Sequence, residues 1–478
     1  MLFNSLNFAF FLPIVFFLYW FVVNKNYKHQ NLLLLVASYF FYACWDYRFM
    51  FLLMFSTLLD YFTGLKMFEA KSINLKKFWF WLSIGVNLGF LGFFKYYNFF
   101  VSSFVEGLSN LGINIDVWTL NVILPVGISF YTFHGLSYVI DIYYNRIKPE
   151  KNIVDYSVFV SFFPLLVAGP IERATHLLPQ IQRERKFNYH NAVDGLRQIL
   201  WGLFKKVVIA DNCAEYANII FNDSANQSGS NLVLGALFFT FQIYCDFSGY
   251  SDIALGTARL FGIDLLRNFA FPYFSRDIAE FWRRWHISLS TWFRDYLYIP
   301  LGGSKGGTWM KIRNTFIIFL VSGFWHGANW TFVAWGFLNA IYFMPLLLAK
   351  TNRNNIGIVA EGKLLPTFRE AISILITFTL TVFAWIFFRA NSLTHAFSYI
   401  KGIFSKSLFT NPTILPISVL FLMVFFIIIE WLGREDKYAI EVLTTKWRRS
   451  IKWGFYYLIL GLIFFFIGKE QEFIYFQF

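Results

Sequence analysis

The stretch NTFIIFLVSGFWHGANWTFVAWGFLNAIYFMPLLLA, residues 314–349, contains two apolar runs, 314–331 and 332–349, with no Lys, Arg, Asp or Glu in either. A helix that crosses a bilayer needs about 20 predominantly apolar residues. Each run is therefore long enough to span a membrane. Similar runs recur along the chain, and their repetition predicts an all-α polytopic membrane protein.

Composition supports this prediction. Of the 478 residues, 57% are hydrophobic and only 14% are charged, whereas soluble domains are about a quarter charged. No linker or internal repeat divides the runs, so we expect a single transmembrane domain over 1–478. The run at 6–23 is too long for the apolar core of a signal peptide, and we expect it to be a retained span. Further runs lie at 31–44, 49–65, 78–101, 119–144, 195–212, 232–250, 370–389, 412–432 and 451–467.

The net charge of +13 comes from basic residues in short loops between the runs. Such loops are retained in the cytoplasm. This rule places 145–152 and 259–313 inside, and the tail after Ile467 outside. It leaves Lys401 and Lys406 outside, against the rule. The expected partners of the basic face are anionic lipid headgroups or a phosphate-bearing donor, and nucleic acid is not expected.

Two segments do not fit simple spans. SVFVSFFPLLVAGP (157–170) is short and ends in Gly-Pro, which predicts a re-entrant loop whose irregular backbone must be covered by protein or water. The segment 271–303 mixes aromatic residues with Arg and Asp, which predicts amphipathic helices at the cytoplasmic interface.

His326 is the sharpest candidate for chemistry, because it lies inside an apolar run. An ionisable side chain at membrane depth is costly and is often tied to a pathway or a proton relay. Histidine suits general-base catalysis near neutral pH. Gly323 and Gly327 beside it would let another helix or a substrate approach closely. The alternative is a structural histidine hydrogen-bonded between helices.

His286 lies in a basic cluster within 281–303. The guanidinium and ammonium groups there match the phosphates of a nucleotide-bearing donor. The alternative is an interfacial anchor on anionic lipid. The candidate donor-binding residues are Arg283, Arg284, Arg294 and Lys305.

A third polar group follows the apolar run at 232–250. Its carboxylates would orient a histidine or receive substrate hydroxyls. Alternatively, they would pair with the arginines of 276–294 as internal struts. The candidate tunnel residues are Gln242, Asp246, Ser248 and Asp252.

Other site classes lack support. The chain has no Gly-x-Ser-x-Gly elbow, no His-Glu-x-x-His helix and no Walker motif. Cys44, Cys213 and Cys245 have no disulfide or zinc spacing, so we expect no metal site and no bound cofactor.

The combination of motifs resembles the membrane-bound O-acyltransferase family, and more closely its bacterial branch of alginate O-acetylases and teichoic-acid D-alanyl transfer proteins. The resemblance runs along the whole chain and implies a ring of about 11 or 12 transmembrane helices with re-entrant and interfacial helices around a thin centre. Among the motifs that carry it are QIYCDFSGYSDIA (242–254), FWRRWHISLSTWFRDYLYIPLGG (281–303), GFWHGANW (323–330) and FIYFQF (473–478).

The resemblance implies that His326 is the catalytic histidine and acts as general base on an acceptor hydroxyl. His286 occupies the second signature position and would position or polarise a thioester. The implied co-substrate is acetyl-CoA or another acyl thioester. The implied acceptor is a polysaccharide or a periplasmic acyltransferase partner, and the implied location is the bacterial cytoplasmic (inner) membrane.

Two further hypotheses stay open. The chain could move another acyl group from a carrier protein, as in D-alanylation, or be a non-catalytic transport or assembly component. Tyr475, in the tail, could accept the acyl group as a phenolic ester and pass it on. The alternative for Tyr475 is an aromatic anchor at the membrane interface.

Overall fold

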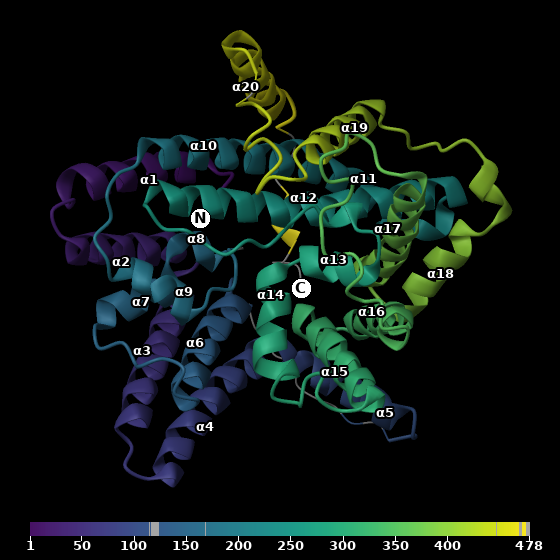
Figure 1. The fold of residues 1–478 in the computed structure, drawn as a ribbon. Coiled ribbons are helices and arrows are strands. Elements are labelled where there is room, and N and C mark those ends of the chain that lie inside the picture. The colour runs from purple at the N-terminus through teal and green to yellow at the C-terminus, as the bar shows by residue number, and fades with distance from the viewer. Residues whose placement is uncertain (114, 116–123, 168, 446, 468–470, 475–478) are drawn as a thin grey trace. The chain divides into compact units, whose positions relative to one another are not determined.

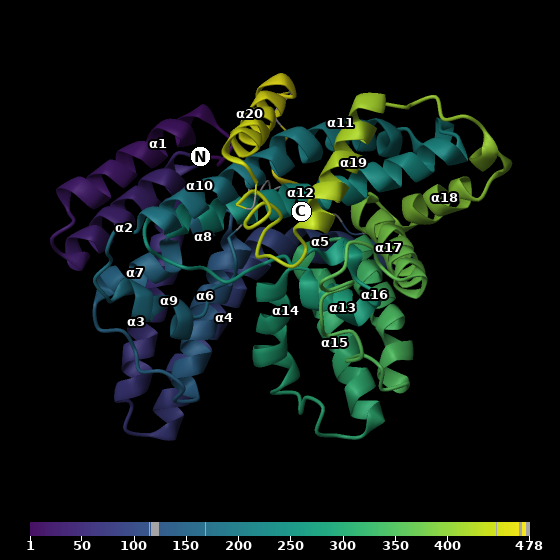
Figure 2. The ribbon, with the colours of Figure 1, turned by 45° about the horizontal axis from the view of Figure 1, so that its top comes forward.

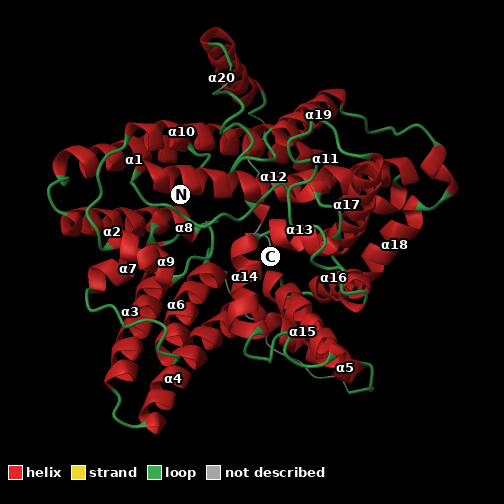
Figure 3. Ribbon diagram, viewed as in Figure 1, coloured by secondary structure: helices red, strands yellow, loops and turns green. Residues whose placement is uncertain are grey.

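The computed structural model describes residues 1–113, 115, 124–167, 169–445, 447–467 and 471–474. Within these ranges every regular element is a helix, as Figure 3 shows, so the predicted all-α class is confirmed. The chain divides into two compact units, Met1–Ala192 with Thr257–Leu266 and Val193–Gly256 with Arg267–Phe478. The division falls inside two helices and no linker marks it, so the single domain over 1–478 stays a prediction.

The first unit contains α1 (Leu6–Phe17), η1 (Leu18–Val22), α2 (Tyr27–Ala43), α3 (Tyr47–Glu69), α4 (Ile73–Leu91), η2 (Gly92–Tyr96), α5 (Tyr97–Ser109), α6 (Ile128–Tyr143), α7 (Ile153–Ser161), α8 (Phe163–Leu166) and α9 (Ala174–Ile181). Helices α3, α4 and α6 pack together, as Figure 1 shows. Buried Asp60 of α3 accepts hydrogen bonds from Ser83 (2.6 Å) and Asn87 (2.8 Å) of α4. Polar side chains join membrane helices in this way.

The segment predicted to be re-entrant breaks at Phe162, between α7 and α8. Phe162 and Phe163 are fully buried, and the Phe163 N–H donates to Ser38 Oγ at 3.0 Å. The irregular backbone is thus covered by protein, as a re-entrant loop requires.

The second unit contains most of α10 (Tyr189–Leu203) and α12 (Gly229–Leu260), together with η3 (Phe204–Ala210), α11 (Asp211–Asn222), η4 (Ser224–Asn226), η5 (Pro272–Phe274), α13 (Ile278–Arg284), α14 (Ile287–Phe293), η6 (Arg294–Tyr298), α15 (Thr308–His326), α16 (Trp330–Leu348), α17 (Phe368–Arg389), α18 (Leu393–Ile403), η7 (Lys406–Phe409), α19 (Ile417–Leu432) and α20 (Arg449–Phe465). Glycines let α10 and α12 cross closely, since a Cβ on Gly202 would lie 2.6 Å from the carbonyl oxygen of Gly249. The predicted interfacial segment forms short helices, α13 and α14, rather than one span.

Five helical stretches in the described part of the chain are long and apolar enough to cross a membrane, namely Tyr47–Glu69, Ile73–Ser109, Gly229–Leu260, Trp330–Leu348 and Phe368–Arg389. Shorter apolar helices cover Leu6–Val22, Ile153–Leu166 and Ile417–Leu432. The predicted run at 119–144 lies partly outside the described residues. The chain is a multi-pass membrane protein.

Candidate active site

His326 is the last residue of α15, and the local sequence explains why the helix ends there. Gly327 has an extended backbone, with φ of −164° and ψ of 153°. Asn329 then caps α16, because its side chain accepts a hydrogen bond from the Thr331 N–H at 3.0 Å. The imidazole therefore projects from the turn between two antiparallel helices.

Glycines hold these two helices close together. A Cβ on Gly323 would lie 2.3 Å from the carbonyl oxygen of Phe332, and one on Gly336 would lie 2.3 Å from that of Phe319. Figure 2 shows α15 and α16 side by side. The close approach of another helix that was predicted at Gly323 is confirmed. It fixes the position of the α15 backbone three residues before His326.

Aromatic rings enclose the His326 imidazole, which is 3% exposed. Its ring centroid lies 5.1 Å from that of Trp335 and 5.3 Å from that of Phe388. The imidazole is therefore held in apolar surroundings at the end of α15.

His286 connects α13 to α14 in a left-handed conformation, with φ of 42° and ψ of 55°. Non-glycine residues seldom adopt this conformation, and such residues cluster at functional sites. The side chain is buried, and its Nδ1 lies 3.3 Å from Asn268 Oδ1. Burial lowers the pKa of His286 to about 3, so the ring is neutral at physiological pH.

One indole ring contacts both histidines. The Trp325 ring centroid is 6.1 Å from that of His286 and 4.9 Å from that of His326. The fold thus brings together two residues that are far apart in sequence and that the motifs singled out separately.

A large cavity lies between the helices that carry the histidines. It has a volume of about 570 Å³, and its walls include Leu289 of α14, Phe319 of α15 and Ser322, which is one turn before His326. Trp282 also lines it and packs 5.6 Å from Trp335, the ring that contacts His326. Four cationic side chains contribute to the lining: Arg294, Lys311, Lys350 and Arg353.

The predicted donor-binding residues have different surroundings. Arg294 lines this cavity and pairs with Asp295 at 2.8 Å. Arg283 donates to the carbonyl oxygens of Asn352 and Asn355. Arg284 pairs with Glu280 at 2.9 Å and donates to Gly357, while Lys305 is exposed and lies outside the cavity lining. Arg283 and Arg284 therefore brace the loop after α16, and a donor-binding role for either stays a prediction.

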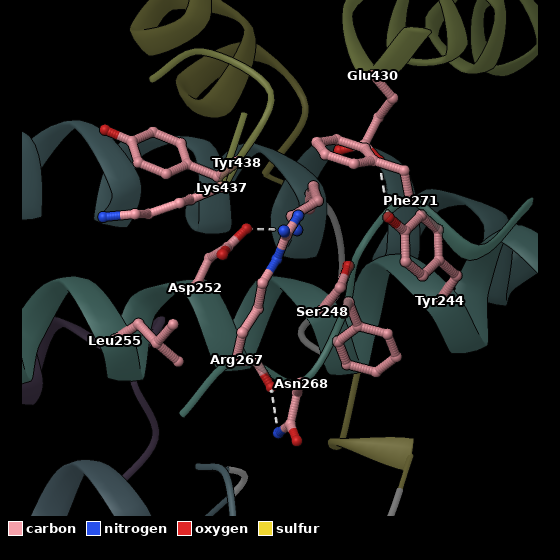
Figure 4. A pocket seen from close by; sticks show the side chains of 13 residues that line it. Tyr244, Ser248, Asp252, Leu255, Arg267, Asn268, Phe271, Glu430, Lys437 and Tyr438 are labelled. Atoms are coloured by element: carbon pink, nitrogen blue, oxygen red, sulfur yellow. Dashed lines mark hydrogen bonds and ion pairs between the residues drawn. The ribbon is translucent and has the colours of Figure 1, made fainter. Parts of the chain in front are cut away.

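A second, polar cavity is much smaller, about 20 Å³, and Figure 4 shows its lining side chains. That volume holds about one water molecule, so the cavity cannot take a donor. Asp252 pairs there with Lys205 at 2.5 Å, and the Tyr244 hydroxyl donates to Glu430 at 2.7 Å. Ser248 also lines it.

The other two predicted tunnel residues, Gln242 and Asp246, are buried on α12 and do not line either cavity. Asp246 pairs with Lys206 at 2.9 Å. The strut hypothesis named the arginines of 276–294 as partners of Asp246 and Asp252, and this part was wrong, because Lys205 and Lys206 are the ion-pair partners. Two consecutive lysines inside the apolar run 195–212 were a usable signal, since lysine at membrane depth needs a partner.

The tail reaches the same region. The carbonyl of Gln471 accepts a hydrogen bond from Lys206 Nζ at 3.0 Å, and the Ile474 N–H donates to Asp246 at 2.7 Å. The ring of Phe473 lies 6.1 Å from that of Phe247, which itself packs 4.7 Å from His286. Tyr475 lies outside the described residues.

Several residues of the site were not predicted from the sequence. Asn268 lies in no recognisable motif, and its contacts are with residues of other segments of the chain. Lys311, Lys350 and Arg353 flank predicted spans, where basic residues are expected for orientation alone.

Comparison with known proteins connects this geometry to an activity. Residues 144–388, which include both histidines, match the MBOAT, membrane-bound O-acyltransferase family. The chain is 41% identical over 408 residues to "Probable alginate O-acetylase AlgI" of Pseudomonas aeruginosa, covering 85% of this chain and 75% of that protein.

Two other relatives carry different names. The chain is 36% identical over 529 aligned positions to a peptidoglycan O-acetyltransferase of Helicobacter pylori, covering 100% of this chain and 98% of that protein. It is 28% identical over 292 residues to a teichoic acid D-alanyltransferase of Bacillus subtilis, covering 58% and 71%.

Proposed function

Since the chain belongs to the membrane-bound O-acyltransferase family and is an O-acyltransferase, we propose that it moves an acetyl group from a cytoplasmic thioester to hydroxyls of an exported or cell-surface polysaccharide. The relatives named for alginate and peptidoglycan acetylation support this acceptor class. The proposed location is the bacterial cytoplasmic (inner) membrane. The observation that carries the proposal is the contact of both His286 and His326 with the Trp325 ring, next to a cavity between their helices.

The larger cavity is the proposed donor site. Its volume of about 570 Å³ falls in the range of small-molecule pockets, about 300–1,000 Å³. The phosphates of acetyl-CoA or of a carrier-bound pantetheine would contact Arg294, Lys311, Lys350 and Arg353, and the acyl end would extend toward Ser322. Replacing Lys350 and Arg353 with Glu should raise KM for the donor with kcat little changed. Lys401→Glu is the matched control, because the Lys401 side chain on α18 is exposed and lies outside the cavity lining.

The proposed chemistry is direct acyl transfer with His326 as general base. His326 takes the proton from the acceptor hydroxyl while the hydroxyl oxygen bonds to the thioester carbonyl carbon. The carbon–sulfur bond then breaks, and the thiolate receives the proton from His326. Holding donor and acceptor together supplies much of the rate enhancement, and His286 positions a substrate.

The critical experiment replaces His326 with Ala in a strain that lacks the natural gene. Mass spectrometry of surface glycans should show loss of acylation, because general-base catalysis contributes about 10²–10⁴-fold. His190→Ala is the matched control, since His190 is exposed on α10. Full acylation by a normally inserted His326→Ala protein would overturn the proposal.

Tyr475 is a proposed acyl relay to a periplasmic acyltransferase partner. The proximity of Phe473 to the ring that packs on His286 supports it. Tyr475→Phe removes the phenolic oxygen and keeps the ring, so it should abolish acceptor acylation if the relay operates. Unchanged acylation would leave the aromatic-anchor alternative.

A second candidate function is D-alanyl-type transfer from a carrier protein, which the similarity to the teichoic acid D-alanyltransferase supports. A non-catalytic transport or assembly role gains no support from these relatives. The mass of the group found on the glycan distinguishes acetyl from D-alanyl.

A further inference from the structure

The segment 268–270 holds the backbone on both sides of His286 through hydrogen bonds of Asn268 and Ala270. The carbonyl oxygen of Asn268 accepts a hydrogen bond from the Ile287 N–H at 2.8 Å. Two residues further on, the Ala270 N–H donates to the carbonyl of Arg284 at 2.9 Å. The extended segment 268–270 therefore lies along the link between α13 and α14 and holds His286 in its left-handed conformation.

The side chain of Asn268 contacts the imidazole itself. Its Oδ1 accepts a hydrogen bond from Ser288 Oγ at 2.6 Å and lies 3.3 Å from His286 Nδ1. At its other end, Nδ2 donates to Ser251 Oγ of α12 at 3.0 Å. All three partners are buried, so the amide is held at both ends in a region of low dielectric.

An amide oxygen has lone pairs and no proton, so it can only accept. With the amide in this orientation, in which Oδ1 also accepts from Ser288, His286 Nδ1 carries the hydrogen in this contact. The neutral imidazole has a single N–H, and its other nitrogen, Nε2, then presents a lone pair. Burial keeps His286 neutral at physiological pH by lowering its pKa to about 3.

We infer that Asn268 is a positioning residue that fixes His286 as the Nδ1–H tautomer, so that Nε2 accepts a hydrogen bond from a substrate O–H or N–H. This inference rests on the proposed function, which makes His286 part of the active site. It excludes polarisation of a thioester carbonyl by neutral His286, because that task needs a donor at Nε2. His286 instead aligns a substrate group for attack beside His326.

Two substitutions separate positioning from folding. Asn268→Leu keeps the approximate size but removes the acceptor, so the imidazole is no longer held as one tautomer and activity should fall. Asn268→Asp keeps the acceptor and adds a negative charge, which raises the pKa of His286. We expect Asn268→Asp to retain most activity at its optimum and to shift the acid limb of its pH–rate profile to higher pH.

The tautomer is measured directly by nitrogen NMR of the full-length protein in detergent, with ¹⁵N-labelled histidine. The His286 signals are assigned by their loss in His286→Gln. The parent protein and Ser288→Ala should show Nδ1–H, and Asn268→Leu should move toward Nε2–H. An Nε2–H parent, or an Asn268→Asp profile identical to that of the parent, would overturn the inference. The NMR measurement needs no acyl transfer, so an unexpected tautomer counts against the role of Asn268 alone. The proposed function is tested separately, and full activity of His326→Ala would overturn it.

Discussion

His286 combines an unfavourable backbone conformation with a buried, neutral side chain. Its φ of 42° costs an L-residue about 1–2 kcal/mol relative to the right-handed region. Asparagine adopts this conformation more readily than most residues. Histidine is also among the residues found more often than most in this conformation, and residues held at such φ values cluster at functional sites.

We expect His286→Asn to lose acyl transfer and to gain stability in a pH-dependent way. An unfolded histidine has a pKa of about 6.5, whereas burial lowers the pKa of His286 to about 3. Below pH 6.5 the unfolded parent binds a proton that the folded parent does not, so the parent loses about 1.4 kcal/mol per pH unit. The stability of the parent protein is therefore fully present above pH 6.5 and decreases as the pH is lowered from 6.5 toward 3.

Thermal melts of both proteins in the same detergent test this prediction. The difference in Tm should favour His286→Asn increasingly between pH 7 and pH 5. A difference that is constant from pH 8 to pH 5 would show that the pKa of His286 is the same in the folded and the unfolded protein, and would contradict the prediction.

Single residues also show what a sequence can reveal. His326 and His286 stand out because an ionisable group in an apolar or interfacial run is unusual. Asn268 does not, because asparagine is common in loops and its partner Ser251 is 17 residues away on another element. Arg283 and Arg284 share a cationic motif with Arg294, yet their hydrogen bonds to loop carbonyls depend on where the loop after α16 folds.

The α15–α16 pair acts as one rigid element, because its glycines allow direct backbone contact. Gly323 faces the carbonyl of Phe332, and Gly336 faces that of Phe319. In a membrane, helix association depends on such close packing, since lipid tails are as apolar as the side chains. The position of His326 is therefore set in part by the backbone contact between α15 and α16.

Gly323→Ala should lower both activity and thermal stability. The added methyl group would lie 2.3 Å from a backbone oxygen, so α15 must move away from α16 and displace His326, three residues further on. Overpacking of this kind costs about 1–3 kcal/mol.

Gly454→Ala on α20 is the matched control, because a Cβ there meets no atom within 4 Å. In that position alanine favours the helix, so activity and Tm should not fall. Parental kcat and Tm in Gly323→Ala would contradict the role assigned to the close contact.

At the scale of the whole molecule, the helical membrane class followed from the length and spacing of the apolar runs. Their number was harder to predict, because several runs form shorter or composite helices, such as η1 continuing α1 and η3 joining α10 to α11. Hydropathy measures transfer into lipid and does not show where a helix breaks inside protein. The irregular segment at 157–170 was predicted from its short length, its Gly-Pro end and the basic residues on both sides of it, but the position of the break at Phe162 was not.

Orientation in the membrane gives a prediction for the whole chain. The distribution of basic loops places Lys148 inside and Lys401 outside, and both side chains are exposed. In a variant with Cys44, Cys213 and Cys245 replaced, we introduce a single cysteine at either position. An impermeant maleimide should label the Lys401→Cys protein in intact spheroplasts.

The Lys148→Cys protein should react only after the membrane is permeabilised. Labelling of both positions from the same side would contradict the assigned parity. Labelling of Lys148→Cys alone in intact spheroplasts would show that the orientation in the membrane is the opposite of the predicted one.

The indole rings around the histidines make the site an optical probe of its own state. Trp325 and Trp335 each pack against His326, and Trp282 lines the large cavity. Indole fluorescence responds to the polarity of its surroundings and is quenched by a protonated imidazole. Entry of a donor or protonation of His326 during turnover therefore changes the emission of these rings, against a background from the rest of the 17 tryptophans. Stopped-flow fluorescence of the parent and of Trp282→Phe then separates donor entry from the chemical step without a labelled substrate.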